Sequence, residues 1–178
     1  MAIGREGDLQ ISIPNTVPWC KFDEILRQEK MHSCMKAVDF VIELPEAVFL
    51  IEFKDPDDPN ASAHPDARAR FRHKLDKETL TNALKIKCRD SWLYRWLNGD
   101  TMDKEIHFYV LIAMEDLTPE ILTRLTENLQ AQLPLLRPNS KEKWGRKFIT
   151  RCGVFNLRTW NQRFPQLPIT RLSASQGI

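Results

Sequence analysis

The sequence is poor in glycine, and this excludes two common kinds of nucleotide-binding site. Its 178 residues include only six glycines, and these form neither a G-x-G-x-x-G motif nor a P-loop, in which glycine lets the backbone approach a phosphate. No apolar run reaches the roughly 18 residues that would predict a membrane-spanning helix. The N-terminal residues are polar and charged and lack an apolar core segment, so we expect no secretory leader.

Paired cysteines are missing as well. Cys20, Cys34, Cys88 and Cys152 are far apart in the sequence and form no C-x-x-C pair. This favours free thiols in a reducing compartment, although four cysteines can in principle form disulfides. His32 with Cys20 and Cys34 fits no common zinc spacing, so ordinary core and surface roles explain these residues better. The sequence therefore predicts a cytoplasmic protein without a structural zinc ion.

A strong overall charge is also missing, but the charge is distributed unevenly. The formal net charge is only +2, whereas positions 137–171 contain nine basic residues and one acidic residue. Such a segment attracts phosphate and indicates nucleic-acid binding, with a solvated basic tail as the simpler alternative. Trp144 and Trp160 lie within it and are candidates for stacking on bases. The residues that we expect to contact nucleic acid are Lys143, Arg146, Lys147 and Arg151.

The hydrophobic pattern predicts a single α/β domain over residues 1–178. Alternating or continuous apolar runs predict strands at 8–13, 31–44, 47–54, 106–114 and 147–157. Helical periodicity with proline or Asn-Gly at the ends predicts helices at 19–30, at 66–97 with a break near 76–79, and from 118 to Pro134. We expect a mixed central sheet flanked by helices, with a core at about 19–114 and a C-terminal helix and basic segment at 118–178.

Two of these strands form a hairpin that places acidic residues opposite each other. If the loop is centred on Pro45-Glu46 and has an even number of residues, Asp39 lies opposite Glu52. Side chains alternate along a strand, so Glu52 and Lys54 point to the same face as Asp39. Pro45 cannot adopt a positive φ, which disfavours a two-residue type I′ loop, whereas a four-residue loop gives the same register.

The apolar residues of the hairpin divide between its two faces. One face is expected to pack against a helix, and it carries Phe40, Ile42, Leu44, Phe49, Ile51 and Phe53. The other face contains the three polar residues together with Val41, Val48 and Leu50. Facing carboxylates in apolar surroundings, with Cβ atoms about 5 Å apart, repel each other and are costly to bury. Three explanations are open: a divalent cation such as Mg²⁺ or Mn²⁺, a salt bridge from Lys54, or one carboxyl that stays protonated.

This pattern resembles the PD-(D/E)XK nuclease superfamily, which has an Asp on one strand and an acid-x-Lys on the next strand of a hairpin. The matching residues are Asp39 in Ala-Val-Asp-Phe-Val-Ile and the triplet Glu52-Phe-Lys54, with Val38 in place of the signature proline. The resemblance implies a restriction-endonuclease-like αβββαβ core. It also implies that Asp39 and Glu52 hold Mg²⁺ or Mn²⁺, assisted by Glu24 on the first helix, and that Lys54 acts on the attacking water or the phosphate.

The function implied by the resemblance is a metal-dependent nuclease that hydrolyses phosphodiester bonds in nucleic acid, with DNA as the expected partner. Its catalytic residues would be Asp39, Glu52 and Lys54, and Lys74 and Lys85 are candidates for the basic or amide residue that often assists from the long helix in this superfamily. The alternative is a catalytically inactive nuclease-fold protein that binds nucleic acid or serves as a subunit of a defence or restriction-type system. A homodimer or a larger complex is compatible with both.

Overall fold

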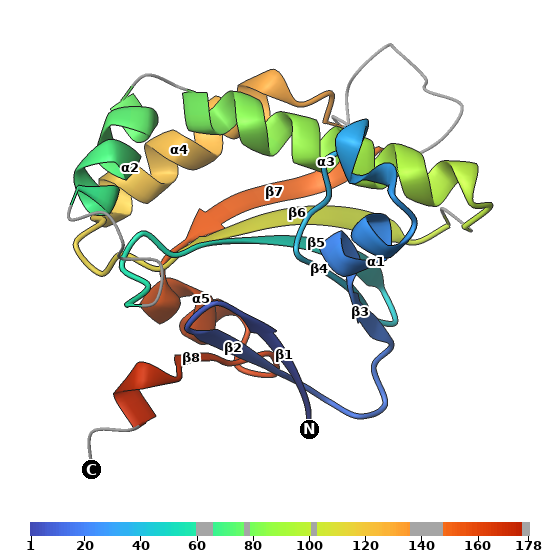
Figure 1. Ribbon diagram of the computed structural model, residues 1–178, viewed down its shortest axis with the longest axis horizontal. Coiled ribbons are helices and arrows are strands. Elements are labelled where there is room, and N and C mark those ends of the chain that lie inside the picture. Colours follow the sequence, from blue (N-terminus) through green and yellow to red (C-terminus); the bar gives the residue numbers. More distant parts are fainter. Residues whose placement is uncertain (60–65, 77–78, 101–102, 136–147, 176–178) are drawn as a thin grey trace.

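The centre of the protein is a mixed five-stranded sheet (Figure 1). The computed structural model describes residues 1–59, 66–76, 79–100, 103–135 and 148–175. In spatial order the strands are β3 (Trp19–Lys21), β4 (Phe40–Glu43), β5 (Ala47–Lys54), β6 (Glu105–Ile112) and β7 (Ile149–Phe155). The first three are antiparallel, whereas β5, β6 and β7 run parallel.

Four helices cover one face of this sheet (Figure 1). They are α1 (Phe22–Gln28), α2 (Ala67–Asp76), α3 (Thr79–Leu97) and α4 (Pro119–Gln132). Helix α4 has Pro119 in its first turn and buries a stripe of Leu122, Leu125 and Leu129 at helical spacing against the sheet. Within the described part of the chain, no helix combines the length and the apolar character needed to cross a membrane.

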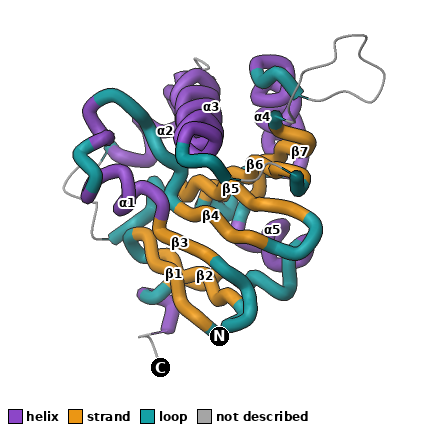
Figure 2. Tube along the Cα trace, turned by 90° about the vertical axis from the view of Figure 1, so that its right-hand side faces the viewer, coloured by secondary structure: helices purple, strands orange, loops and turns teal. Residues whose placement is uncertain are grey.

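A small antiparallel sheet and α5 (Leu157–Arg163) cover the opposite face (Figure 2). The small sheet has the order β1 (Ala2–Glu6), β2 (Leu9–Ile13) and β8 (Ile169–Arg171). Alternation along β2 buries Leu9, Ile11 and Ile13 completely. We expected a helix on this face of the hairpin, and α5 does lie there, but it shares the face with the small sheet.

The hairpin of β4 and β5 has the register predicted from the sequence. Phe40 pairs with Ile51 and Glu43 with Val48, and the Leu44 N–H donates to the Ala47 carbonyl at 2.9 Å. Neither Pro45 nor Glu46 has a positive φ, which agrees with the expected absence of a type I′ turn. The predicted division between the two faces is also confirmed. Val41, Val48 and Leu50 pack under the helices, and the residues predicted for the opposite face pack on the other side of the sheet: Phe40, Ile42, Leu44, Phe49, Ile51 and Phe53.

The α/β class with a mixed sheet flanked by helices is confirmed, but the order of elements differs from the αβββαβ expectation. Residues 19–21 are extended because they pair with 40–42, so the helix expected at 19–30 begins only at Phe22. The strand expected at 31–44 is limited to β4, and the long helix is divided into α2 and α3. Only two strands therefore lie between α1 and α2 in the described residues, and the third antiparallel strand, β3, precedes α1.

Candidate functional site

Asp39 and Glu52 lie at the same end of the hairpin. Asp39 immediately precedes β4, and the hairpin register continued by one residue places it opposite Glu52. Asp39 is 4% exposed and Glu52 is completely buried. The backbone fixes Asp39 on both sides: its carbonyl accepts from the Phe22 N–H at 2.8 Å, and its Oδ2 accepts from the Phe53 N–H at 2.6 Å. The carboxylate is therefore held by main-chain contacts.

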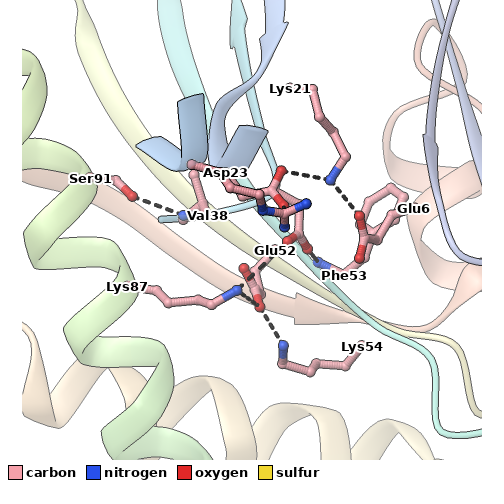
Figure 3. Close-up of polar contacts among 11 residues, drawn as sticks. Glu6, Lys21, Asp23, Val38, Glu52, Phe53, Lys54, Lys87 and Ser91 are labelled. Carbon is pink, nitrogen blue, oxygen red and sulfur yellow. Dashed lines mark hydrogen bonds and ion pairs between the residues drawn. The ribbon is translucent and has the colours of Figure 1, made fainter. Parts of the chain in front are cut away.

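Two lysines meet at the carboxylate of Glu52 (Figure 3). Lys54 Nζ donates to Oε1 of Glu52, and Lys87 Nζ on α3 donates to the same oxygen at 2.6 Å. Lys87 Nζ also lies 3.6 Å from Oδ1 of Asp39. One ammonium group thus bridges the two carboxylates, and the structure brings Asp39, Glu52 and Lys54 together with a fourth residue, Lys87.

The sequence pattern alone does not single out Lys87, although a signal for it exists. Lys87 lies one helical turn before Ser91 on α3, and the Ser91 hydroxyl accepts from the Val38 N–H at 2.9 Å beside the site. A lysine on the inner side of a helix needs an acidic partner. Of the two lysines that we considered instead, Lys85 hydrogen-bonds to Gln132 at 3.3 Å and Lys74 is exposed on α2.

A second acidic group shares Asp39. Carboxylate oxygens of Asp39, Asp23 on α1 and Glu6 at the end of β1 lie within 4.8 Å of one another. The ammonium group of Lys21 lies beside them, donating to Asp23 at 2.8 Å and to Glu6 (Figure 3). Asp39 therefore offers oxygen ligands in combination with Glu52 or with the two acids of this group.

Glu24, which we expected to join the metal site, is exposed on α1. The acid of α1 that lies close to Asp39 is its neighbour Asp23. The helix begins at the buried Phe22, and each further residue turns by about 100° around the helix axis. A shift of one residue along the helix therefore decides which acid faces the site, and the sequence pattern does not fix the start of α1 closely enough.

The electrostatics of the site leave Asp39 and Glu52 incompletely compensated. Burial and the facing Glu52 carboxylate raise the pKa of Asp39 to about 7, against the opposing effects of the Lys87 ammonium and the Phe53 N–H. Burial acts to lower the pKa of Lys87, but Glu52 and Asp39 outweigh it and raise that pKa. Oε2 of Glu52 is buried and has no hydrogen-bond partner among the described residues. Such an oxygen is costly, so this hard-oxygen donor set fits Mg²⁺ or Mn²⁺.

The lysine side chains, not an open cavity, form the solvent-facing layer of the site. The side chains of Lys54 and Lys87 are 29% and 25% exposed, above carboxylates that are almost inaccessible. A cavity of about 680 Å³ lies elsewhere, at the β7 edge of the sheet, beside α4 and Arg163. A ligand that approaches Asp39 and Glu52 therefore meets two positive charges first, which suits an anionic group.

Of the basic residues predicted to bind nucleic acid, Arg151 lies in the described part of the chain, and it is not brought to this site. Arg151 is exposed near the start of β7, with its Nε 3.6 Å from Oε2 of Glu105. Trp160 is completely buried and donates its Nε1–H to the Leu167 carbonyl at 2.8 Å. The expectation that Trp160 stacks on bases is therefore wrong, because its ring fills the core beneath the sheet. The remaining predicted residues lie outside the described part of the chain: Lys143, Trp144, Arg146 and Lys147.

Comparisons with known proteins add no further information on the chain. No family model matches it, and searches of curated proteins and of solved structures return no match. The residues of the site and their geometry are therefore the basis for inferring a function.

Proposed function

We propose that this protein is a metal-dependent nuclease that hydrolyses phosphodiester bonds in nucleic acid, with DNA as its substrate. The observation that carries the proposal is the hairpin pair Asp39 and Glu52. These are two buried carboxylates with Lys54 at hydrogen-bond distance, and one oxygen of Glu52 has no hydrogen-bond partner in the part of the chain that the structure describes. The PD-(D/E)XK resemblance supports the same assignment, since these three residues are the ones that match its signature.

Asp39 and Glu52 would hold Mg²⁺ or Mn²⁺, and the acid of α1 that lies beside Asp39 is Asp23, in a group with Glu6, instead of Glu24. With Glu6, four carboxylates in this region stand against the ammonium groups of Lys21, Lys54 and Lys87 and the guanidinium of Arg27, which contacts Asp23 at 3.3 Å. A bound divalent ion would neutralise phosphate charge and make a water molecule more acidic.

The lysines of the site would act on the phosphate through their positive charge. The raised pKa of Lys87 keeps its ammonium group protonated at neutral pH, so Lys87 is unsuited to act as a base. Its bridging position holds the two carboxylates at a fixed separation. Lys54 would turn from Glu52 to an oxygen of the substrate phosphate, where it stabilises the charge that develops in the transition state.

One observation supports the non-catalytic alternative. Lys54 and Lys87 both contact Glu52, so two positive charges already stand against Asp39 and Glu52 without a metal ion. An inactive nuclease-fold protein could retain this ion-paired group for stability alone. It would bind nucleic acid or a partner protein and would not cleave.

A cleavage assay distinguishes the two functions. We expect the wild-type protein to nick supercoiled plasmid, or to degrade single- or double-stranded oligonucleotides, with Mg²⁺ or Mn²⁺ but not in EDTA. Lys54→Ala should be slower by at least about tenfold, or 1.4 kcal/mol of barrier, because it removes positive charge from the transition state and spares the metal ligands. Ca²⁺ should support binding with little cleavage.

Two results would count against the proposal. If the wild-type protein binds these substrates and leaves them intact with every metal, the non-catalytic alternative is the better one. If Lys54→Ala cleaves as fast as wild type, the activity comes from another site or from a contaminant.

A further inference from the structure

A cavity of about 320 Å³ lies beside the candidate site and shares Lys54 with it. The end of β5 and one face of α2 form its walls, and its charged residues are Lys54, Asp55, Arg70 and Lys74. Figure 1 shows α2 beside the end of the sheet at which β5 finishes. Because Lys54 also donates to Glu52, the cavity and the carboxylates are direct neighbours.

The charge of this cavity is positive. Its single acid, Asp55, is paired with the guanidinium of Arg171, from which both carboxylate oxygens accept at 2.8 Å, and the same guanidinium also contacts Asp8 at 3.3 Å. Within the described ranges, no carboxylate forms an ion pair with Arg70 or Lys74. Both residues are exposed. Three cationic side chains thus line the cavity, and its one carboxylate, that of Asp55, is paired with Arg171 instead of with them.

The basic residues of α2 form two pairs with different surroundings. Arg68 and Arg72, one helical turn apart, both contact Asp116, with Arg68 Nη2 at 2.8 Å. Arg70 and Lys74 are also four residues apart, and they lie roughly opposite on the helix, since two residues correspond to about 200° of rotation. One pair therefore docks the helix on the protein, and the other pair is available to a ligand.

We propose that Arg70 and Lys74, together with Lys54, form a phosphate subsite that binds the backbone of the nucleic acid next to the bond that is cleaved. This inference rests on the proposed function and deepens it by assigning the surface along which the strand runs. The arginine guanidinium can bind a phosphate with two parallel hydrogen bonds, and the lysine adds a compact charge. Their separation of about 6 Å along the helix axis lets both contact one strand.

The subsite is separate from the surface around Arg151. Lys54 pairs with Ile112 at the carboxyl end of the parallel strands, whereas Arg151 pairs with His107, which is level with Phe49. Five residues of extended strand, about 17 Å, therefore separate the two positions along the sheet. Phosphate contacts close to the cleaved bond come from α2 and not from Arg151.

The test compares two double variants that remove the same charge. Arg70→Gln with Lys74→Gln alters the subsite on α2, and the control, Lys30→Gln with Arg124→Gln, alters exposed residues outside both the subsite and the basic segment at 137–171. Affinity for a fluorescent single-stranded oligonucleotide is measured by anisotropy in EDTA over a range of KCl concentrations. Thermal unfolding verifies that each variant is folded.

We expect the α2 variant to bind about tenfold more weakly at low salt, and its slope of log affinity against log salt to be smaller by about 1.4. The control variant should stay within about twofold of wild type. Equal affinity and slope for the two variants would overturn the subsite.

The same proteins are then assayed on plasmid with Mg²⁺, so that the two proposals fail separately. Intact cleavage and unchanged binding in the α2 variant would reject the subsite and leave the nuclease standing. Binding that depends on Arg70 and Lys74, in a wild-type protein that cleaves nothing, would support the subsite and reject the nuclease.

Discussion

Asp8 and Asp39 are equally inaccessible to solvent, at 3% and 4% exposure, but their surroundings differ. Asp8 accepts hydrogen bonds from the Ser173 N–H at 2.9 Å, from the Ser173 hydroxyl at 2.6 Å and from Arg171 at 3.3 Å. Asp39 accepts from the Phe53 N–H and otherwise faces the carboxylate of Glu52, with Lys87 at 3.6 Å.

The pKa values of these two carboxyls move in opposite directions. Burial acts to raise both. At Asp8, which lies close to the surface and is covered by its own partners, the hydrogen bonds from Ser173 and Arg171 prevail and lower the pKa. At Asp39, which lies in the interior, burial and the charge of Glu52 prevail and raise the pKa to about 7. The Asp8 group therefore stabilises the fold, whereas the Asp39 group is held at a cost in stability, as is common at functional sites.

The largest effect on stability is expected from Lys87→Met. It removes the ammonium group that bridges Asp39 and Glu52, and unfolding in urea should show a loss of about 3 kcal/mol. Adding Glu52→Gln to this variant should restore part of the loss, because it removes one of the two facing carboxylate charges and leaves Lys54 to offset the other. A loss below about 0.5 kcal/mol in the single variant would contradict the bridging role.

The substitution Asp8→Asn should lower the free energy of unfolding by about 2 kcal/mol. The asparagine side chain has no charge to pair with Arg171. Its NH₂ group is a donor, and it would replace an oxygen that accepts a hydrogen bond from Ser173. The measurement is urea unfolding at pH 7. Unchanged stability would show that the Asp8 group contributes nothing, and the contrast with Asp39 would disappear.

The same substitution at Asp39 should have the opposite sign. In Asp39→Asn the amide oxygen still accepts from the Phe53 N–H, and the repulsion with Glu52 is removed, so the metal-free protein should gain about 1 kcal/mol at pH 8. Since the folded pKa is raised, the contribution of Asp39 to stability is present below its ordinary pKa and is lost as pH rises through about 7.

The stability gained by Asp39→Asn should therefore shrink between pH 8 and pH 5. Urea unfolding of both proteins at the two pH values provides the comparison. A gain that is the same at both values, or a loss at pH 8, would show that Asp39 is not under electrostatic strain.

The sequence predicted the hairpin well because its information is local. The largely apolar segments Phe40 to Leu44 and Ala47 to Lys54 predict both strands, and Pro45 limits the loop. These features predict that Asp39, Glu52 and Lys54 lie on one face.

Elements that depend on distant pairing were not predictable in this way. The strand β3 is three residues long and is extended because it pairs with β4, and β8 is equally short and pairs with β2. The choice of Asp23 over Glu24 depends on the first residue of α1, and the position of Lys87 depends on how α3 packs on the sheet. A periodic pattern identifies a helix but locates its ends only within a few residues.

The central claim, that Asp39 and Glu52 form a divalent-metal site, is tested most directly by calorimetric titration of the protein with Mn²⁺. We expect the wild-type protein to bind Mn²⁺ and to be stabilised by about 2.7 kcal/mol when the free ion is at one hundred times its Kd. Asp39→Asn and Glu52→Gln should be folded and should show neither effect. Absence of Mn²⁺ binding to the wild-type protein, or undiminished binding to both variants, would contradict the account.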